Sequence, residues 1–86
     1  MSVKIRLDSD EEAEATAFDG NLLTLRSPRA FAPGAPIRFK TADESARPFE
    51  GRTIGSKRID DQRFEVRMRF VNLRRSDREL LIQELG

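Results

Sequence analysis

The sequence predicts a mainly β fold that ends in one short α-helix. Three observations favour it: apolar and polar residues alternate with period two in several segments, turn-forming residues separate those segments, and a helix-capping pattern precedes the last apolar run. With 86 residues, the chain has the length of a single domain, expected over residues 1–86. One core must therefore serve the whole molecule.

Three strands are expected in the N-terminal third. Residues 3–7 alternate apolar with basic side chains, as in a strand with one buried face. Residues 13–18 predict a second strand, although their alanines are weak strand formers. The Asp-Gly-Asn turn at residues 19–21 precedes Leu-Leu-Thr-Leu at 22–25, and Asp-Gly between apolar segments is a strong hairpin signal. We therefore expect a β-hairpin over residues 13–25.

Prolines and glycines divide the middle of the chain. The prolines within residues 27–36 exclude a regular strand ladder and predict a surface connection. Residues 37–40 then alternate Ile and Phe with Arg and Lys, which predicts another strand. A further strand opens at Phe49, and its Gly51 and Gly55 predict a bulge or a close approach of another backbone.

The C-terminal part carries the clearest strand pattern and the helix. Residues 63–70 alternate without error, which assigns these apolar side chains to the core: Phe64, Val66, Met68 and Phe70. Ser76 and Glu79 have the spacing of a capping box, so Ser76 is the expected N-cap of a helix over residues 77–85. So short a helix must dock on the sheet. Its expected apolar face is formed by Leu80, Leu81, Ile82 and Leu85.

The composition argues against catalysis. Cysteine and histidine are both absent, which removes disulfides, thiolate nucleophiles, the commonest general base and the usual zinc ligands. We therefore expect no catalytic residue, no metal site and no cofactor. No apolar run approaches the length of about 18 residues that a membrane span needs, and the N-terminus lacks the apolar stretch of a signal peptide. A cytoplasmic protein that does not insert into membranes is expected.

The charge balance disfavours nucleic acid as a partner. Sixteen basic and fifteen acidic residues give a net charge of +1, unlike the uniform positive field of a dedicated nucleic-acid binder. The chain also has no Tyr or Trp on which bases could stack. The basic excess lies in the C-terminal half, where residues 45–86 carry ten Lys and Arg against seven Asp and Glu.

The order of these elements resembles the PilZ domain family. Residues 23–25 and 30–39 resemble the Leu-x-Leu strand of that family and the apolar-x-x-Gly-x-x-apolar segment that follows it. Residues 49–54 and 64–70 resemble its two later strands. The resemblance extends over residues 3–85 and implies a small six-stranded β-barrel with a short C-terminal α-helix.

PilZ domains are best known as receptors for cyclic di-GMP, which they bind through an Arg-x-x-x-Arg motif and an Asp/Asn-x-Ser-x-x-Gly motif. This sequence departs from both, because Arg6 has no second arginine four residues away and Asp19 falls where it would repel an anionic dinucleotide. Arg6, Asp19 and Asn21 are thus a candidate degenerate nucleotide site, at which cyclic di-GMP is not expected to bind. The resemblance instead implies protein contacts in bacterial signalling or motility.

Two groups of arginines are candidate contacts for a partner. Arg63, Arg67 and Arg69 share one face of the predicted strand 63–70 and could bind an acidic partner or a phosphate, or form an ordinary solvent face. Arg26 and Arg29 flank a Ser-Pro pair and could form an anion-binding loop, or an ordinary exposed one. We predict a non-catalytic protein-interaction module of unidentified partner. A cyclic di-GMP receptor with an atypical site and a small nucleic-acid-binding β-barrel remain alternatives.

Overall fold

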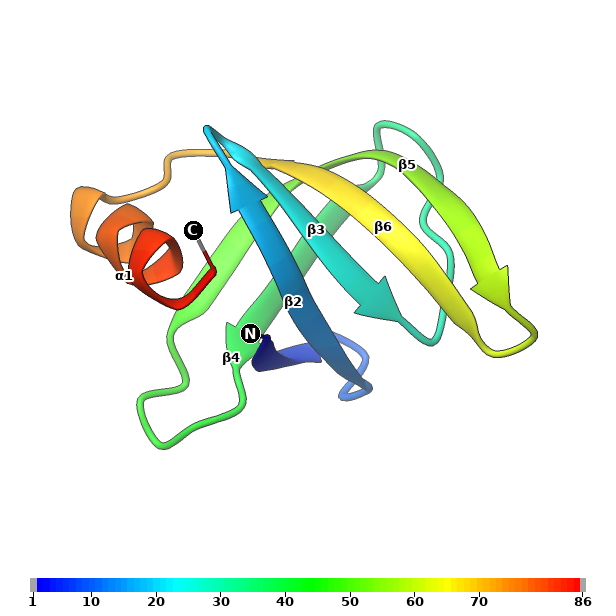
Figure 1. Cartoon of the computed structure of the whole chain (residues 1–86), viewed down its shortest axis with the longest axis horizontal. Helices are drawn as coiled ribbons and strands as arrows, with labels where there is room; N and C mark the ends of the chain where they lie inside the picture. Colours follow the sequence, from blue (N-terminus) through cyan, green and yellow to red (C-terminus); the bar gives the residue numbers. More distant parts are fainter. Residues whose placement is uncertain (1, 86) are drawn as a thin grey trace.

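The computed structural model describes residues 2–85 as a closed six-stranded antiparallel β-barrel followed by one helix (Figure 1). The predicted mainly β fold and barrel are confirmed. Around the barrel the strands follow the order β1-β2-β3-β6-β5-β4, and β4 closes onto β1. No helix within this range is long and apolar enough to cross a membrane. The elements are β1 (Val3–Leu7), β2 (Glu12–Asp19), β3 (Leu22–Ser27), β4 (Pro36–Thr41), β5 (Pro48–Asp60), β6 (Arg63–Phe70) and α1 (Arg75–Leu85).

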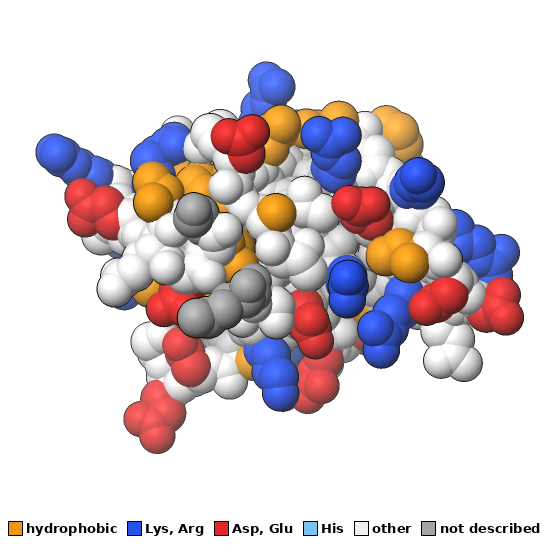
Figure 2. All heavy atoms as spheres, in the orientation of Figure 1, with side chains coloured by type: hydrophobic (Ala, Val, Ile, Leu, Met, Phe, Trp, Pro, Cys, Tyr) orange, Lys and Arg blue, Asp and Glu red, His pale blue; other side chains and the backbone are white. Residues whose placement is uncertain are grey.

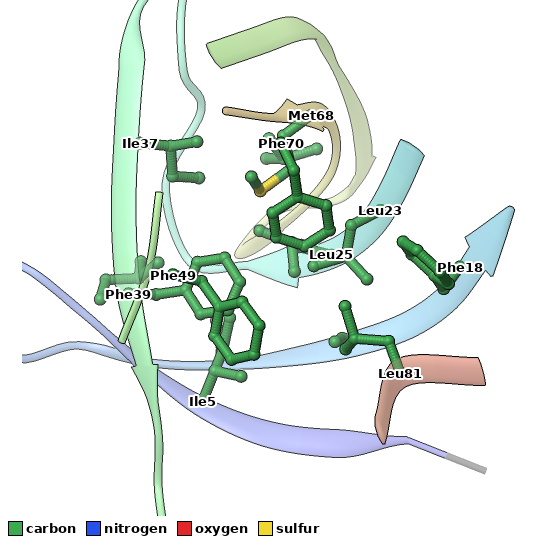
Figure 3. Packing of buried hydrophobic residues seen from close by; sticks show 14 residues of the cluster. Ile5, Phe18, Leu23, Leu25, Ile37, Phe39, Phe49, Met68, Phe70 and Leu81 are labelled. Carbon is green, nitrogen blue, oxygen red and sulfur yellow. The ribbon is translucent and has the colours of Figure 1, made fainter. Parts of the chain in front are cut away.

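The barrel interior is filled by side chains from all six strands and by Leu81 of α1 (Figure 3). Phe39 and Phe49 stack with their ring centroids 5.2 Å apart, and Phe70 packs against both. These rings lie toward the end of the barrel that α1 covers. The buried apolar residues are Ile5, Leu7, Ala13, Ala15, Phe18, Leu23, Leu25, Ile37, Phe39, Phe49, Val66, Met68, Phe70 and Leu81.

The alternation predicted for β6 is confirmed. Val66, Met68 and Phe70 are buried. Phe64 is partly buried and packs against the rim of the core. It is the second residue of β6 and pairs with Ser27 at the end of β3 and with Arg58 of β5. The tip of the β5–β6 hairpin extends beyond β3 (Figure 1).

The glycines of the turns and of β5 adopt the structures that the sequence predicts. The hairpin between β2 and β3 turns at Gly20, whose φ of 64° lies in the left-handed region that glycine tolerates best. In β5 both predicted alternatives occur, a close backbone approach at one glycine and a bulge at the other. Gly51 lies so close to β6 that an added Cβ would overlap the carbonyl oxygen of Arg69. A register shift between Thr53 and Gly55 forms a bulge.

The helix begins within two residues of Ser76, as predicted, but its N-cap and its buried face differ from the prediction. It begins at Arg75, so Ser76 lies in the first turn, and the capping role expected of Ser76 is wrong. Leu81 is the one buried apolar residue of α1, whereas Ile82 is 51% exposed. Asp77 is also buried, and its carboxylate accepts a hydrogen bond of 3.0 Å from Arg47, in the loop after β4. The helix therefore docks through Leu81 and the Asp77–Arg47 ion pair, with Leu85 partly buried against the core.

Thr53 places a hydroxyl inside the barrel without a hydrogen-bond partner among the described residues. The residue is 3% exposed, and an unsatisfied buried hydroxyl costs about 1–3 kcal/mol. We expect Thr53→Val, which keeps the shape, to raise the free energy of unfolding by about 1 kcal/mol in urea denaturation. Thr24→Val, on the outer face of β3, should change it by less than about 0.5 kcal/mol. A loss of stability in Thr53→Val would show that the hydroxyl is satisfied.

Candidate functional site

The outer face of β3, β6 and β5 carries most of the basic side chains that sequence reasoning singled out. Figure 2 shows basic side chains spread over the area that these strands occupy in Figure 1, with acidic and apolar side chains among them. Strand register sorts this face into rows that run across the strands. In the row that passes through Glu65 of β6 the charges alternate, because Arg26 lies between Glu14 and Glu65, and Glu65 is followed by Lys57. This row is electrostatically balanced.

The next two rows are not balanced. Arg67 lies between Thr24 and Gly55, so neither cross-strand neighbour is charged. Arg69 lies between Leu22 and Arg52, which puts two like charges directly opposite each other, an arrangement that destabilises a sheet. We call Arg52, Arg67 and Arg69 the arginine cluster.

All three members of the cluster are exposed, and none has a carboxylate within 4.0 Å among residues 2–85. Arg52 donates one hydrogen bond of 3.1 Å to the carbonyl oxygen of Gly34, which fixes its stem beside β4. Ile54, at the bulge of β5, adds an apolar side chain that is 44% exposed. The surface thus combines unpaired guanidinium groups with an apolar contact, the residue types that interfaces favour.

The predicted group of Arg63, Arg67 and Arg69 is exposed along one strand, as expected. Arg63 is nevertheless separate from the other two, because Glu65 lies between them on the same face. Asp60 is the residue opposite Arg63 in the strand register of the hairpin. Arg52 takes its place beside Arg69. Sequence reasoning missed Arg52, since its neighbour depends on the register of β5 against β6.

The structure does not bring the candidate degenerate nucleotide site together. Arg6 pairs with Glu12 at the start of β2, and Asp19 is the last residue of that strand, so the two lie at opposite ends of an eight-residue strand. The guanidinium of Arg6 is 3.4 Å from Asp10 and 3.8 Å from Glu12. Two nearby carboxylates therefore occupy it.

Asn21 has a structural role in the described part of the chain. Its side-chain amide donates to the carbonyl oxygen of Phe70 at 3.1 Å, and its backbone carbonyl oxygen accepts from the Phe70 N–H. Arg78 of α1 donates to the Asn21 side chain and to the Gly20 carbonyl. These bonds join the β2–β3 turn to the end of β6 and to the helix, so Asn21 is not free for a ligand.

Arg26 and Arg29 do not form a common anion-binding loop. Arg26 belongs to the balanced row on β3. Arg29 turns away, because the Ser27 hydroxyl accepts from the Arg29 N–H at 3.1 Å and donates to its carbonyl oxygen at 2.8 Å. The Arg29 guanidinium then lies 3.5 Å from Glu11 and over the ring of Phe31.

A groove of about 790 Å³ lies between β4, β5 and the segment that joins β6 to α1. Its charged walls are largely paired, by Arg38 with Glu50 at 3.5 Å and by Arg47 with Asp77 at 3.0 Å. The loop that carries Arg47 is held by Asp43, which accepts hydrogen bonds from the Ser45 and Thr41 hydroxyls. These bonds lower the pKa of the Asp43 carboxyl. Sequence reasoning did not find the ion pair of Arg47 with Asp77, because these two residues meet only in the folded chain.

The described residues contain no group of three or more His, Cys, Asp or Glu side chains that could hold a metal ion. In the arginine cluster, like charges lie opposite each other and none of the three arginines has a carboxylate partner among residues 2–85. No protein-family model, curated protein or solved structure matches this chain.

Proposed function

We propose that this chain is a non-catalytic, PilZ-like protein-interaction module of bacterial signalling or motility that acts in the cytoplasm. It binds an acidic region of another protein through the outer face of β3, β6 and β5. The observation that supports this proposal is the arginine cluster, in which Arg52 and Arg69 lie directly opposite each other without a carboxylate partner. The six-stranded barrel with its C-terminal helix is the architecture that the PilZ resemblance implies.

The physical argument is that a bound acidic surface would remove the unfavourable charge pairing. Opposed guanidinium groups raise the energy of the free protein, and carboxylates placed between them would form charge-assisted hydrogen bonds. Arg is well suited to this because its planar fork binds carboxylates while its stem covers apolar surface. The exposed Ile54 adds apolar area that a partner could bury.

The other two function classes receive less support from the same face. Base stacking needs exposed aromatic rings, whereas the phenylalanines are all buried or partly buried. Cyclic di-GMP would need arginines that converge on phosphates, whereas Arg6 of β1 is ion-paired and lies opposite the start of β2, at the other end of that strand from Asp19. An acidic protein partner needs no arginine that is ion-paired within residues 2–85, and Arg52, which donates one hydrogen bond to Gly34, keeps further donors.

The test is a charge reversal of the cluster with a matched control. Arg67→Glu with Arg69→Glu should reduce capture of the partner from a lysate of the cells that make this protein by at least about tenfold, because two attractive pairs become repulsive. The thermal midpoint should stay within about 2 °C, since both side chains are exposed. Lys4→Glu with Lys40→Glu changes the same charge on the β1 and β4 side of the barrel, and should keep the partner. Equal capture by both double variants would refute the proposed surface.

A further inference from the structure

We infer that the arginine cluster recognises an extended acidic segment in which two carboxylates are spaced two residues apart, as in Glu-x-Glu. This inference rests on the proposed function and specifies the chemistry of the partner. It is carried by the positions of the three guanidinium-bearing residues relative to one another, by the exposed Ile54 beside them and by the acidic residue that limits the cluster on one side.

The spacing along β6 sets the spacing of the ligand. Arg67 and Arg69 are alternate residues of one strand, so their side chains leave the same face about 7 Å apart. In an extended peptide, side chains two residues apart also share a face with about 7 Å between them. Two carboxylates in Glu-x-Glu can therefore meet Arg67 and Arg69 together, whereas adjacent glutamates point to opposite faces.

The spacing across the strands makes one of these contacts the stronger. Arg52 lies directly opposite Arg69 on the neighbouring strand, at the roughly 5 Å separation of paired strands. One carboxylate can then accept hydrogen bonds from Arg69 and from the guanidinium donors of Arg52 that do not bind Gly34, while the second carboxylate meets Arg67 alone. Neutralising the Arg52 and Arg69 pair also removes the repulsion between them.

Two neighbours of the cluster limit which segments fit. Glu65 is the outward-facing residue of β6 next to Arg67 on the side away from Arg69. A third carboxylate two residues beyond the one that meets Arg67 would therefore meet a like charge. The acidic stretch of the partner is therefore short. Ile54 lies at the register shift, between the β5 residue that is opposite Met68 and the β5 residue that is opposite Arg67. It offers an apolar contact beside the two carboxylates.

The experiment uses short synthetic peptides and amide chemical shifts of the labelled whole chain at low salt. The probe is acetyl-Thr-Glu-Val-Glu-Thr-amide, and its control is acetyl-Thr-Val-Glu-Glu-Thr-amide, which has the same composition and charge. We expect the probe to bind at least about fivefold more tightly, with its largest shift changes around Arg52, Arg67 and Arg69. A longer peptide, acetyl-Thr-Glu-Val-Glu-Thr-Glu-amide, should gain no affinity from its third glutamate.

Variants assign the contacts. Arg69→Gln should lower the affinity for the probe at least tenfold and Arg67→Gln by less, because Arg69 shares its carboxylate with Arg52. The Lys4→Glu and Lys40→Glu double variant should bind the probe as the wild type does, apart from a small loss through net charge. Equal affinity for the two five-residue peptides, shift changes centred elsewhere, or no binding at millimolar peptide would overturn the inference.

The two proposals can fail separately. If charge reversal at Arg67 and Arg69 abolishes capture of the cellular partner but the peptides bind equally, the surface is an interface without the inferred spacing rule. If that double variant retains its partners, the proposed function at this surface fails whatever the peptides do.

Discussion

Replacing Gly51 by alanine should lower the free energy of unfolding by at least about 2–3 kcal/mol. A Cβ at this position would overlap both the carbonyl oxygen of Arg69 and the end of the Met68 side chain. Met68 can change rotamer, but the carbonyl belongs to the backbone of β6, so the two strands must move apart. A chain of this size has roughly 4–13 kcal/mol of stability in total, and the thermal midpoint should fall by about 10 °C or more.

Gly55 supplies the control within the same strand. An added Cβ there has no atom within 4 Å, so Gly55→Ala should leave stability unchanged or raise it by up to about 1 kcal/mol, because alanine restricts the unfolded chain. Thermal unfolding followed by circular dichroism compares the two variants directly. A wild-type midpoint for Gly51→Ala would mean that β5 and β6 do not approach as closely as the structure shows.

The strands were predictable wherever one face of a strand is buried along its length. Val66, Met68 and Phe70 alternate with arginines because the barrel interior lies on one side of β6 and solvent on the other. The Asp19-Gly20 turn was readable for a different reason, since the left-handed backbone at Gly20 restricts which residues can occupy it. Both signals are local in sequence.

The arginine cluster was not predictable, because it depends on two register shifts. The β5–β6 hairpin starts with Asp60 opposite Arg63, and regular pairing from there would put Ile54 opposite Arg69. Irregularities between Arg58 and Asp60 and between Thr53 and Gly55 displace the pairing, so that Arg52 takes that position. The sequence predicted that the β5 glycines could mark a bulge, but not how far bulges would shift the charges.

The helix shows the same limit for tertiary contacts. Four apolar residues in its sequence predicted a broad apolar face, yet the docking geometry buries only Leu81 among them. Arg47 reaches Asp77 from the loop after β4, and Arg78 reaches the β2–β3 turn. These contacts set the rotation of the helix on the barrel, and they join residues that are distant in sequence.

Leu81→Ala should cost about 2–4 kcal/mol, the second of the two largest effects expected. Leu81 is 3% exposed and packs in the core cluster near Phe18 (Figure 3), so its truncation leaves a cavity where α1 meets the barrel. An isolated helix of 11 residues is marginal in water. Loss of its one buried apolar anchor should therefore weaken the helix itself as well as the packing, with a measurable decrease in helical circular dichroism before the barrel unfolds.

Ile82→Ala is the matched control, because it removes an aliphatic side chain from the next position of the same helix. Ile82 is 51% exposed, so its truncation should change the free energy of unfolding by less than about 0.5 kcal/mol. Urea denaturation of the two variants separates burial from helix propensity, since alanine is the better helix former at both positions. If both variants lose the same stability, α1 does not dock through Leu81, and the rotation of the helix on the barrel must differ from the one described.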